Sequence, residues 1–177
     1  MRLPGDPSAQ DRTARMVRVD HAGEYGAVRI YQGQRAVLGR GPAAPVLAHM
    51  QAQEEAHLAR FDALIAERGV RPTALLPLWH LAGFALGAAT AALGERAAMA
   101  CTVAVEETIC AHYAGQEDAL GPEEADLRAT IAGFRAEEAE HRDIGLDHGA
   151  RQAPGYRVLT AAIKAGCRVA IALSERV

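Results

Sequence analysis

Two Glu-x-x-His motifs constrain this sequence more than any other feature: Glu54 with His57, and Glu138 with His141. Each lies in a run of apolar residues that recur every three or four positions, the spacing that places side chains on one face of an α-helix. A carboxylate and an imidazole one turn apart on such a face reach the same point in a helical core. The motifs therefore predict long helices packed around a polar centre.

Two further apolar helical faces each carry one glutamate, Glu24 in the first half of the chain and Glu106 in the second. The chain thus reads glutamate, Glu-x-x-His, glutamate, Glu-x-x-His. The separation is 30 residues from Glu24 to Glu54 and 32 residues from Glu106 to Glu138. This spacing indicates a weak internal repeat of a two-helix unit.

Glycine and proline clusters divide the chain into helical segments. They predict helices near 11–39, 43–68, 96–119 and 123–149, and a shorter one near 156–174. We expect a single domain over 1–177 with a flexible tail at 1–10. The predicted fold is all-α: a ferritin-like four-helix bundle with a long apolar crossover helix and a C-terminal helix.

The crossover, residues 70–95, contains the most apolar stretch of the chain. Residues 78–93 carry no charged side chain. A helix that spans a bilayer needs about 20 apolar residues, so this stretch is short for that purpose. It predicts a segment that lies on a membrane surface. A buried core helix and a hydrophobic dimer interface are the alternatives.

Four carboxylates on core-facing positions are difficult to explain by structure alone. A buried carboxylate without a partner costs several kcal/mol or becomes protonated, and four together repel one another. Two divalent cations remove both problems, and carboxylate with imidazole suits iron. The sequence predicts two iron ions per chain, held by Glu24, Glu54, His57, Glu106, Glu138 and His141. The spacing alone does not decide whether Glu106 or its neighbour Glu107 is the iron ligand in that helix.

Other polar residues are candidates for the surroundings of this centre. Asp20 and Asp143 are predicted to bind the free N–H groups of the histidine ligands. His112 and Tyr113 are predicted to line the substrate or proton path as catalytic residues. Weaker candidates are His21 and His148, and the glutamates expected to be exposed or to lie just outside the centre are Glu55, Glu107, Glu137 and Glu140.

Charge and cysteine usage exclude some classes of function. The net charge is −3 and no basic patch is interleaved with aromatic residues, so we expect no nucleic-acid partner. The three cysteines form no Cys-x-x-Cys pair, which argues against the separate cysteine-rich iron site of rubrerythrin-type peroxidases.

Longer segments carry a resemblance to a known family. They are VDHAGEYGA at 19–27, QEEAHLARF at 53–61, MACTVAVEETICAHY at 99–113 and EEAEHRDIGLDH at 137–148. With them, the chain resembles the demethoxyubiquinone hydroxylase family from about residue 17 to 177. The resemblance implies the same six iron ligands and selects Glu106 over Glu107.

The resemblance implies a di-iron monooxygenase of ubiquinone biosynthesis that hydroxylates a demethoxyubiquinol ring with O2. It implies a lipid-soluble quinol substrate, an external reductant, expected to be NADH, and a peripheral position on the cytoplasmic face of a bacterial cell membrane. Self-association and contact with other ubiquinone-biosynthesis proteins are further expectations. The alternative is a ferritin-like ferroxidase or iron-binding protein, against which the apolar crossover argues.

Overall fold

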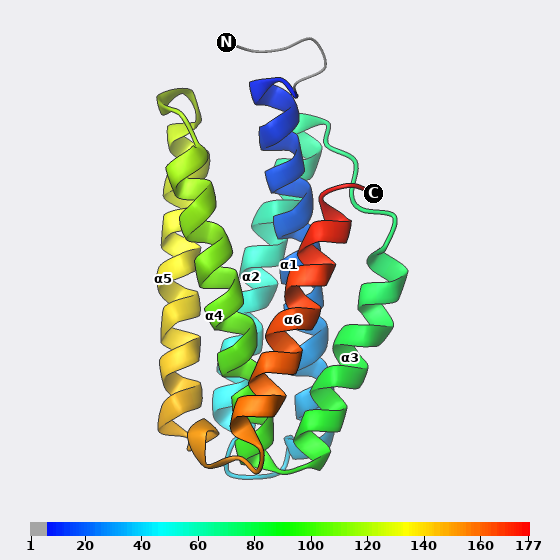
Figure 1. The fold of residues 1–177 in the computed structure, drawn as a ribbon, viewed down its shortest axis with the longest axis vertical. Coiled ribbons are helices and arrows are strands. Elements are labelled where there is room, and N and C mark those ends of the chain that lie inside the picture. The colour runs from blue at the N-terminus through cyan, green and yellow to red at the C-terminus, as the bar shows by residue number, and fades with distance from the viewer. Residues whose placement is uncertain (1–6) are drawn as a thin grey trace.

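The computed structural model describes residues 7–177, which form α-helices and short 3-10 turns without a strand in that range (Figure 1). Four long helices form a bundle, and the predicted all-α, ferritin-like class is confirmed. These helices are α1 (Ala9–Leu38), α2 (Ala44–Arg68), α4 (Glu95–Ala119) and α5 (Ala125–Asp147). The crossover helix is α3 (Leu76–Ala92), the C-terminal helix is α6 (Tyr156–Ser174), and the turns are η1 (Pro122–Glu124) and η2 (Ala150–Gln152).

The first helix begins two residues earlier than predicted, at Ala9. Ser8 caps it: the Ser8 hydroxyl accepts from the Asp11 N–H, and the Asp11 carboxylate accepts from the Ser8 N–H. This reciprocal capping box satisfies backbone donors that an α-helix leaves free at its start. Of the predicted flexible tail at 1–10, residues 9 and 10 are therefore helical, and residues 1–6 lie outside the described part of the chain.

Two apolar clusters fill the bundle on either side of a polar centre. Along α2, Met50 belongs to one cluster and Phe61 to the other. Glu54 and His57 lie between these two residues in the sequence and are equally buried. The break in the apolar face of α2 therefore falls inside the bundle, as the sequence predicts.

The crossover helix α3 lies along α1 with very close contact between the two backbones. A Cβ atom added to Gly87 would overlap the carbonyl oxygen of Ile30, and one added to Gly83 would lie 2.8 Å from the Gly26 oxygen. Small residues at helix crossings permit this approach because no side chain separates the backbones. At the other edge of α3, the Trp79 indole donates to the Ser174 hydroxyl at 3.0 Å, which joins α3 to α6.

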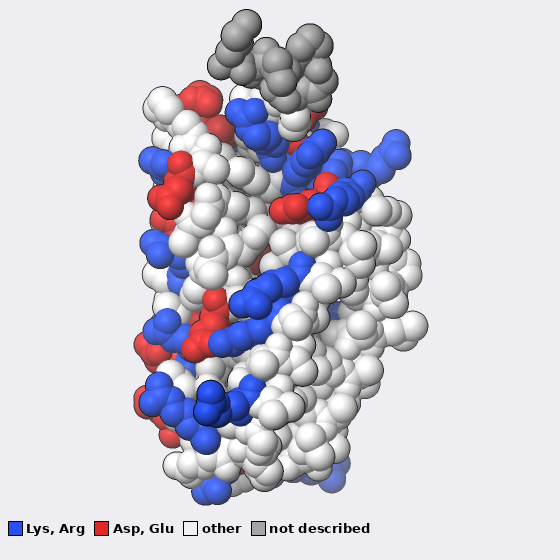
Figure 2. All heavy atoms as spheres, viewed as in Figure 1, with Lys and Arg blue, Asp and Glu red and all other residues white. Residues whose placement is uncertain are grey.

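The outward faces of α3 and α6 are apolar. Leu81, Leu93 and Val158 are 70%, 71% and 76% exposed. Figure 2 shows a broad area without Lys, Arg, Asp or Glu on the side where α3 lies. Among the described residues, none of the helices combines the length and the hydrophobicity needed to cross a bilayer.

Candidate metal centre

Each of the four bundle helices contributes to one buried polar centre. Glu24 comes from α1, Glu54 and His57 from α2, Glu106 from α4, and Glu138 and His141 from α5. All six side chains are at most 1% exposed. The structure therefore brings together all the residues that were predicted to bind metal. Glu107, the alternative to Glu106, instead forms an ion pair with Lys164 on α6.

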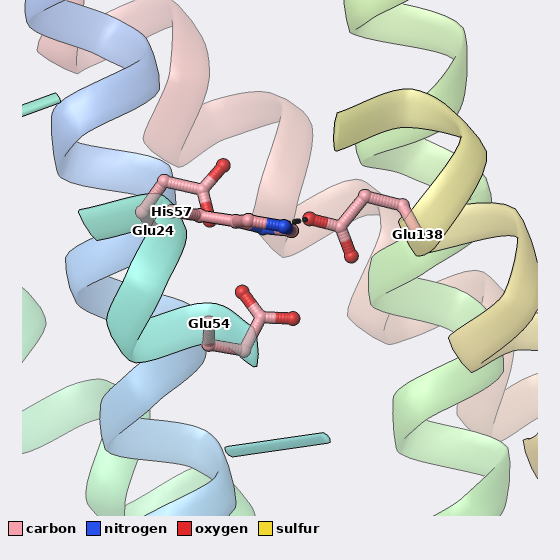
Figure 3. Close-up of side chains that lie close together, drawn as sticks. All are labelled: Glu24, Glu54, His57 and Glu138. Atoms are coloured by element: carbon pink, nitrogen blue, oxygen red, sulfur yellow. Dashed lines mark hydrogen bonds and ion pairs between the residues drawn. The ribbon is translucent and has the colours of Figure 1, made fainter. Parts of the chain in front are cut away.

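The six side chains form two overlapping groups. Glu24 and His57 belong to one, and Glu106 and His141 to the other, whereas Glu54 and Glu138 belong to both. Within each group one ligand atom from every residue lies within 4.8 Å of the others. Figure 3 shows the first group, with Glu138 facing His57 across the bundle. Two adjacent sites that share two carboxylates can hold a dinuclear metal centre.

Both histidines direct the Nδ1 atom toward the carboxylates. The Nδ1 atom of His57 lies 3.2 Å from Glu138 Oε1 and 3.5 Å from Glu24 Oε2. The Nδ1 atom of His141 lies 3.0 Å from Glu54 Oε1 and 3.3 Å from Glu138 Oε2. The Nδ1 lone pairs are therefore the ones available to a metal ion.

Burial shifts the protonation equilibria of these groups. It raises the pKa of Glu54 and Glu106 well above the usual range, and the negative charge of Glu138 adds to both shifts. Burial also raises the pKa of Glu138, but hydrogen bonds from His141 and His57 outweigh it and lower that pKa to about 2. For His57, burial lowers the pKa, but hydrogen bonds to Glu138 and Glu24 raise it to about 11.

Several buried atoms of the centre have no hydrogen-bond partner among the described residues. They include both carboxylate oxygens of Glu54 and one oxygen each of Glu24, Glu106 and Glu138. Buried polar atoms in folded proteins are nearly always satisfied, so a group of unsatisfied ones needs an explanation. Two divalent cations would coordinate these oxygens and balance four carboxylate charges. The donor set of oxygen and imidazole nitrogen fits iron.

A tyrosine binds each of the two glutamates that belong to a single group. The Tyr31 hydroxyl donates to Glu106 Oε1 at 2.8 Å, and the Tyr113 hydroxyl donates to Glu24 Oε1. Both tyrosines are buried. Tyr113 is one of the residues predicted from the sequence. Tyr31 is not, although its position on the same helical face as Glu24 could have indicated it.

The histidines bind their outer partners through Nε2. The Nε2–H of His57 donates to Glu137 Oε2 at 2.9 Å, and that of His141 donates to Gln53 Oε1 at 3.0 Å. The prediction that Asp143 has this role is wrong, because Asp143 is 60% exposed and pairs with Arg142. Gln53 was missed, although it and Glu137 each precede the glutamate of a Glu-x-x-His motif.

Asp20 also has a different position from the one predicted. Its Oδ1 accepts from the Gln116 amide at 2.7 Å and lies 3.3 Å from His112 Nε2. It contacts neither of the two histidines of the centre in the interactions that the structure records. Burial raises the pKa of Asp20, against the lowering effect of His112.

The predicted catalytic residue His112 lies between this buried aspartate and the surface. It lines a groove of about 460 Å³ between α4 and α6, together with Lys164 and Arg168. The weaker candidates do not reach the centre: His21 pairs with Asp62 at 2.9 Å, and His148 lies 3.3 Å from Glu95.

Comparison with known proteins gives a consistent assignment. The profile of the family described as ubiquinone biosynthesis protein COQ7 matches residues 11–174. A 3-demethoxyubiquinol 3-hydroxylase of Rhodospirillum rubrum is 65% identical over 99% of this chain and 84% of its own length. The human mitochondrial NADPH-dependent 3-demethoxyubiquinone 3-hydroxylase is 58% identical over 92% of this chain and 76% of its own. A mitochondrial 5-demethoxyubiquinone hydroxylase of Saccharomyces cerevisiae is 44% identical, over 92% and 77% respectively.

Proposed function

The chain belongs to the family of ubiquinone biosynthesis protein COQ7, and on that basis we propose that it is a 3-demethoxyubiquinol 3-hydroxylase with a di-iron centre. The observation that carries the proposal is the pair of overlapping buried sites that share Glu54 and Glu138. The names of the relatives supply the substrate class, a demethoxyubiquinol. Buried carboxylates and histidines supply the means to hold two iron ions.

Two iron ions held by these residues would supply the activation of O2 for a hydroxylation, in which one oxygen atom enters the quinol ring as a hydroxyl and the other leaves as water with two electrons and two protons. In this proposal Glu24 and His57 hold one ion, and Glu106 and His141 hold the other. Tyr113 and Tyr31 fix the orientation of the two outer carboxylates by hydrogen bonds. The apolar clusters on both sides exclude bulk water from the centre.

The reaction needs two electrons from an external donor, which we propose to be a nicotinamide nucleotide. The family resemblance implies NADH, whereas the human relative is named NADPH-dependent. An assay of the purified protein with each nucleotide in turn distinguishes the two.

Protons reach the buried centre through His112 and Asp20 in this proposal. The hydrogen bond to Asp20 raises the pKa of His112 against the lowering effect of burial. Protonated His112 pairs with the Asp20 carboxylate, whose Oδ1 lies 3.3 Å from His112 Nε2, and exchanges a proton with water in the groove between α4 and α6. Gln116 holds Asp20 in place, and Tyr113 lies next to His112 in the chain, with its hydroxyl on Glu24.

We expect iron-loaded protein, supplied with a demethoxyubiquinol analogue, reductant and ¹⁸O2, to place one labelled oxygen atom in the ring. His112→Asn should lower the turnover rate about a hundredfold, the lower end of general acid–base contributions. The exposed His49→Asn serves as the control and should leave turnover unchanged. Label found only in water, with oxidation of ferrous ions, would contradict hydroxylation and favour the ferroxidase alternative.

The outward faces of α3 and α6 fit a membrane surface, from which a lipid-soluble quinol would enter. On α6, the apolar residues Val158 and Val169 point outward, and one flank carries the cationic residues Arg157, Lys164 and Arg168. Helices of this pattern lie in the interface of anionic bilayers. Figure 2 shows Lys and Arg beside the apolar area. We propose peripheral binding at the cytoplasmic face, where self-association or another ubiquinone-biosynthesis protein would compete for the same surface.

Removal of two of these charges should weaken binding to anionic vesicles. Each basic residue near such a surface contributes about 1 kcal/mol, so Arg157→Gln with Arg168→Gln should lower the partition coefficient roughly thirtyfold. The matched control is Arg128→Gln with Arg142→Gln on α5. Binding to neutral vesicles should be the same for all three proteins. Equal loss in both double variants would mean that net charge, and not the α6 surface, determines binding.

A further inference from the structure

The two halves of the centre correspond residue by residue. Tyr31 follows Glu24 by seven positions on α1, and Tyr113 follows Glu106 by seven positions on α4. Each tyrosine donates to the glutamate of the other helix. The internal repeat therefore becomes an approximate two-fold relation between the site of Glu24 and His57, called site A below, and the site of Glu106 and His141, called site B.

The outer partners of the histidines obey the same relation but differ in chemistry. Glu137 on α5 accepts from His57 of site A, and Gln53 on α2 accepts from His141 of site B. Both partners occupy the position before the motif glutamate, and the Gln53 amide donates to Glu137 Oε2 at 3.4 Å. One histidine thus faces a carboxylate, and the other faces a neutral amide.

A second ionisable group that breaks the two-fold relation, Asp20, lies on the same side of the centre as Glu24. Gln116 reaches across to Asp20, which lies four positions before Glu24. The amide of the equivalent Gln34 donates to the Ala98 carbonyl at 3.0 Å and to the Thr102 hydroxyl, four positions before Glu106, at 3.4 Å. Of the two buried side-chain acceptors, only the one on the Glu24 side is ionisable. In both pairs of contacts, the one made by the histidine partners and the one made by the glutamines, the carboxylate lies on the side of site A.

We infer that Glu137 and Gln53 are positioning residues that make the two metal sites unequal, with site A the tighter one. Both fix the histidines with Nε2–H outward and Nδ1 inward. A carboxylate that accepts from Nε2–H also makes the imidazole more basic, so that its Nδ1 lone pair binds a metal ion more strongly. Loss of such a partner costs about 10–100-fold in metal affinity. An amide does this less because it carries no charge. The inference rests on the proposed dinuclear centre.

Titration of the metal-free protein with Co²⁺ under anaerobic conditions, followed by calorimetry and by absorption, tests it. Wild-type protein should bind two ions in two resolved steps. Glu137→Gln should weaken the first step about 10–100-fold, so that the two steps merge. Gln53→Glu should strengthen the second step. A general loss of packing would not move the two variants in opposite directions.

Two controls complete the test. The side chains of Glu137 and Gln53 are partly exposed, so neither substitution buries a new charge. As a control, substitution of the exposed Glu140 on α5 by Gln should leave both binding steps unchanged. His57→Ala should remove the tight step and retain the weak one, which assigns the tight step to site A. Two steps that do not respond to Glu137→Gln would overturn the inference but retain the dinuclear centre. No bound Co²⁺ in wild-type protein would overturn both.

Discussion

Glu54→Gln is expected to abolish the dinuclear centre while leaving the fold intact. Glu54 belongs to both metal sites, and an amide at that position removes the negative charge that the two sites share and replaces one of the two carboxylate oxygens by an NH2 group, which does not bind a metal ion. Loss of an outer partner already costs 10–100-fold in affinity, so loss of a shared ligand should lower bound iron from two ions to fewer than one per chain. Hydroxylation should fall by more than about a hundredfold. Iron analysis and the labelled-oxygen assay measure the two effects.

The same substitution should stabilise the metal-free protein. Both oxygens of Glu54 are buried, and among the described residues neither accepts a hydrogen bond, although His141 Nδ1 lies 3.0 Å from Oε1. Burial raises the pKa of Glu54 well above 4.5. In the metal-free protein the folded state therefore binds a proton more tightly than the unfolded state. The resulting stability is present at low pH and disappears as the pH rises through the folded pKa. At pH 8, Glu54→Gln should thus raise the free energy of unfolding by roughly 1–3 kcal/mol.

Opposite effects with and without iron distinguish ligand loss from misfolding. The control is Glu140→Gln, an exposed change on α5 that should alter neither iron content nor stability. If metal-free Glu54→Gln protein melted at a lower temperature than wild type, the contact of Glu54 with His141 would outweigh the cost of the buried charge, and the charge argument for the metal centre would lose its basis.

The sequence predicted the six residues of the centre because their signal is local. Each lies on a helical face that is otherwise apolar, so its burial follows from periodicity alone. Glu54 and His57 are three residues apart, so they lie one turn apart on the same face of a helix, and this follows without any knowledge of the neighbouring helices. The two glutamates that are shared between the sites are the glutamates of the motifs, which the repeat already distinguished from Glu24 and Glu106.

The outer partners could not be predicted because they depend on how α2 and α5 are placed across the bundle. Asp143 follows His141 by two positions. Side chains two positions apart on a helix point in different directions, so the Asp143 carboxylate pairs with Arg142 instead. Gln53 binds His141 from the opposite helix, 88 positions away in the chain. Sequence distance carries no information about such a contact.

The placement of α3 against α1 depends on glycine, and Gly87→Ala should therefore be among the most damaging single changes outside the metal centre. The added methyl group would overlap the backbone of Ile30, which cannot move aside because it is part of the hydrogen-bonded α1 helix. Overpacking of this kind costs about 1–3 kcal/mol. For a chain of this size, the melting temperature should fall by roughly 5–10 °C.

Gly133→Ala on α5 is the matched control, since among the described residues no atom beyond its chain neighbours and the local helix backbone lies within 4 Å of a Cβ at that position. There, alanine should stabilise the helix by about 0.5–1 kcal/mol. The comparison also tests function: displacement of α3 from α1 would strain the 2.7 Å hydrogen bond between Tyr25 and His80 and shift the apolar face that we propose to meet the bilayer. Gly87→Ala should therefore reduce vesicle binding while iron content remains at two ions per chain. If both alanine variants proved equally stable, the close α1–α3 crossing would not hold in solution.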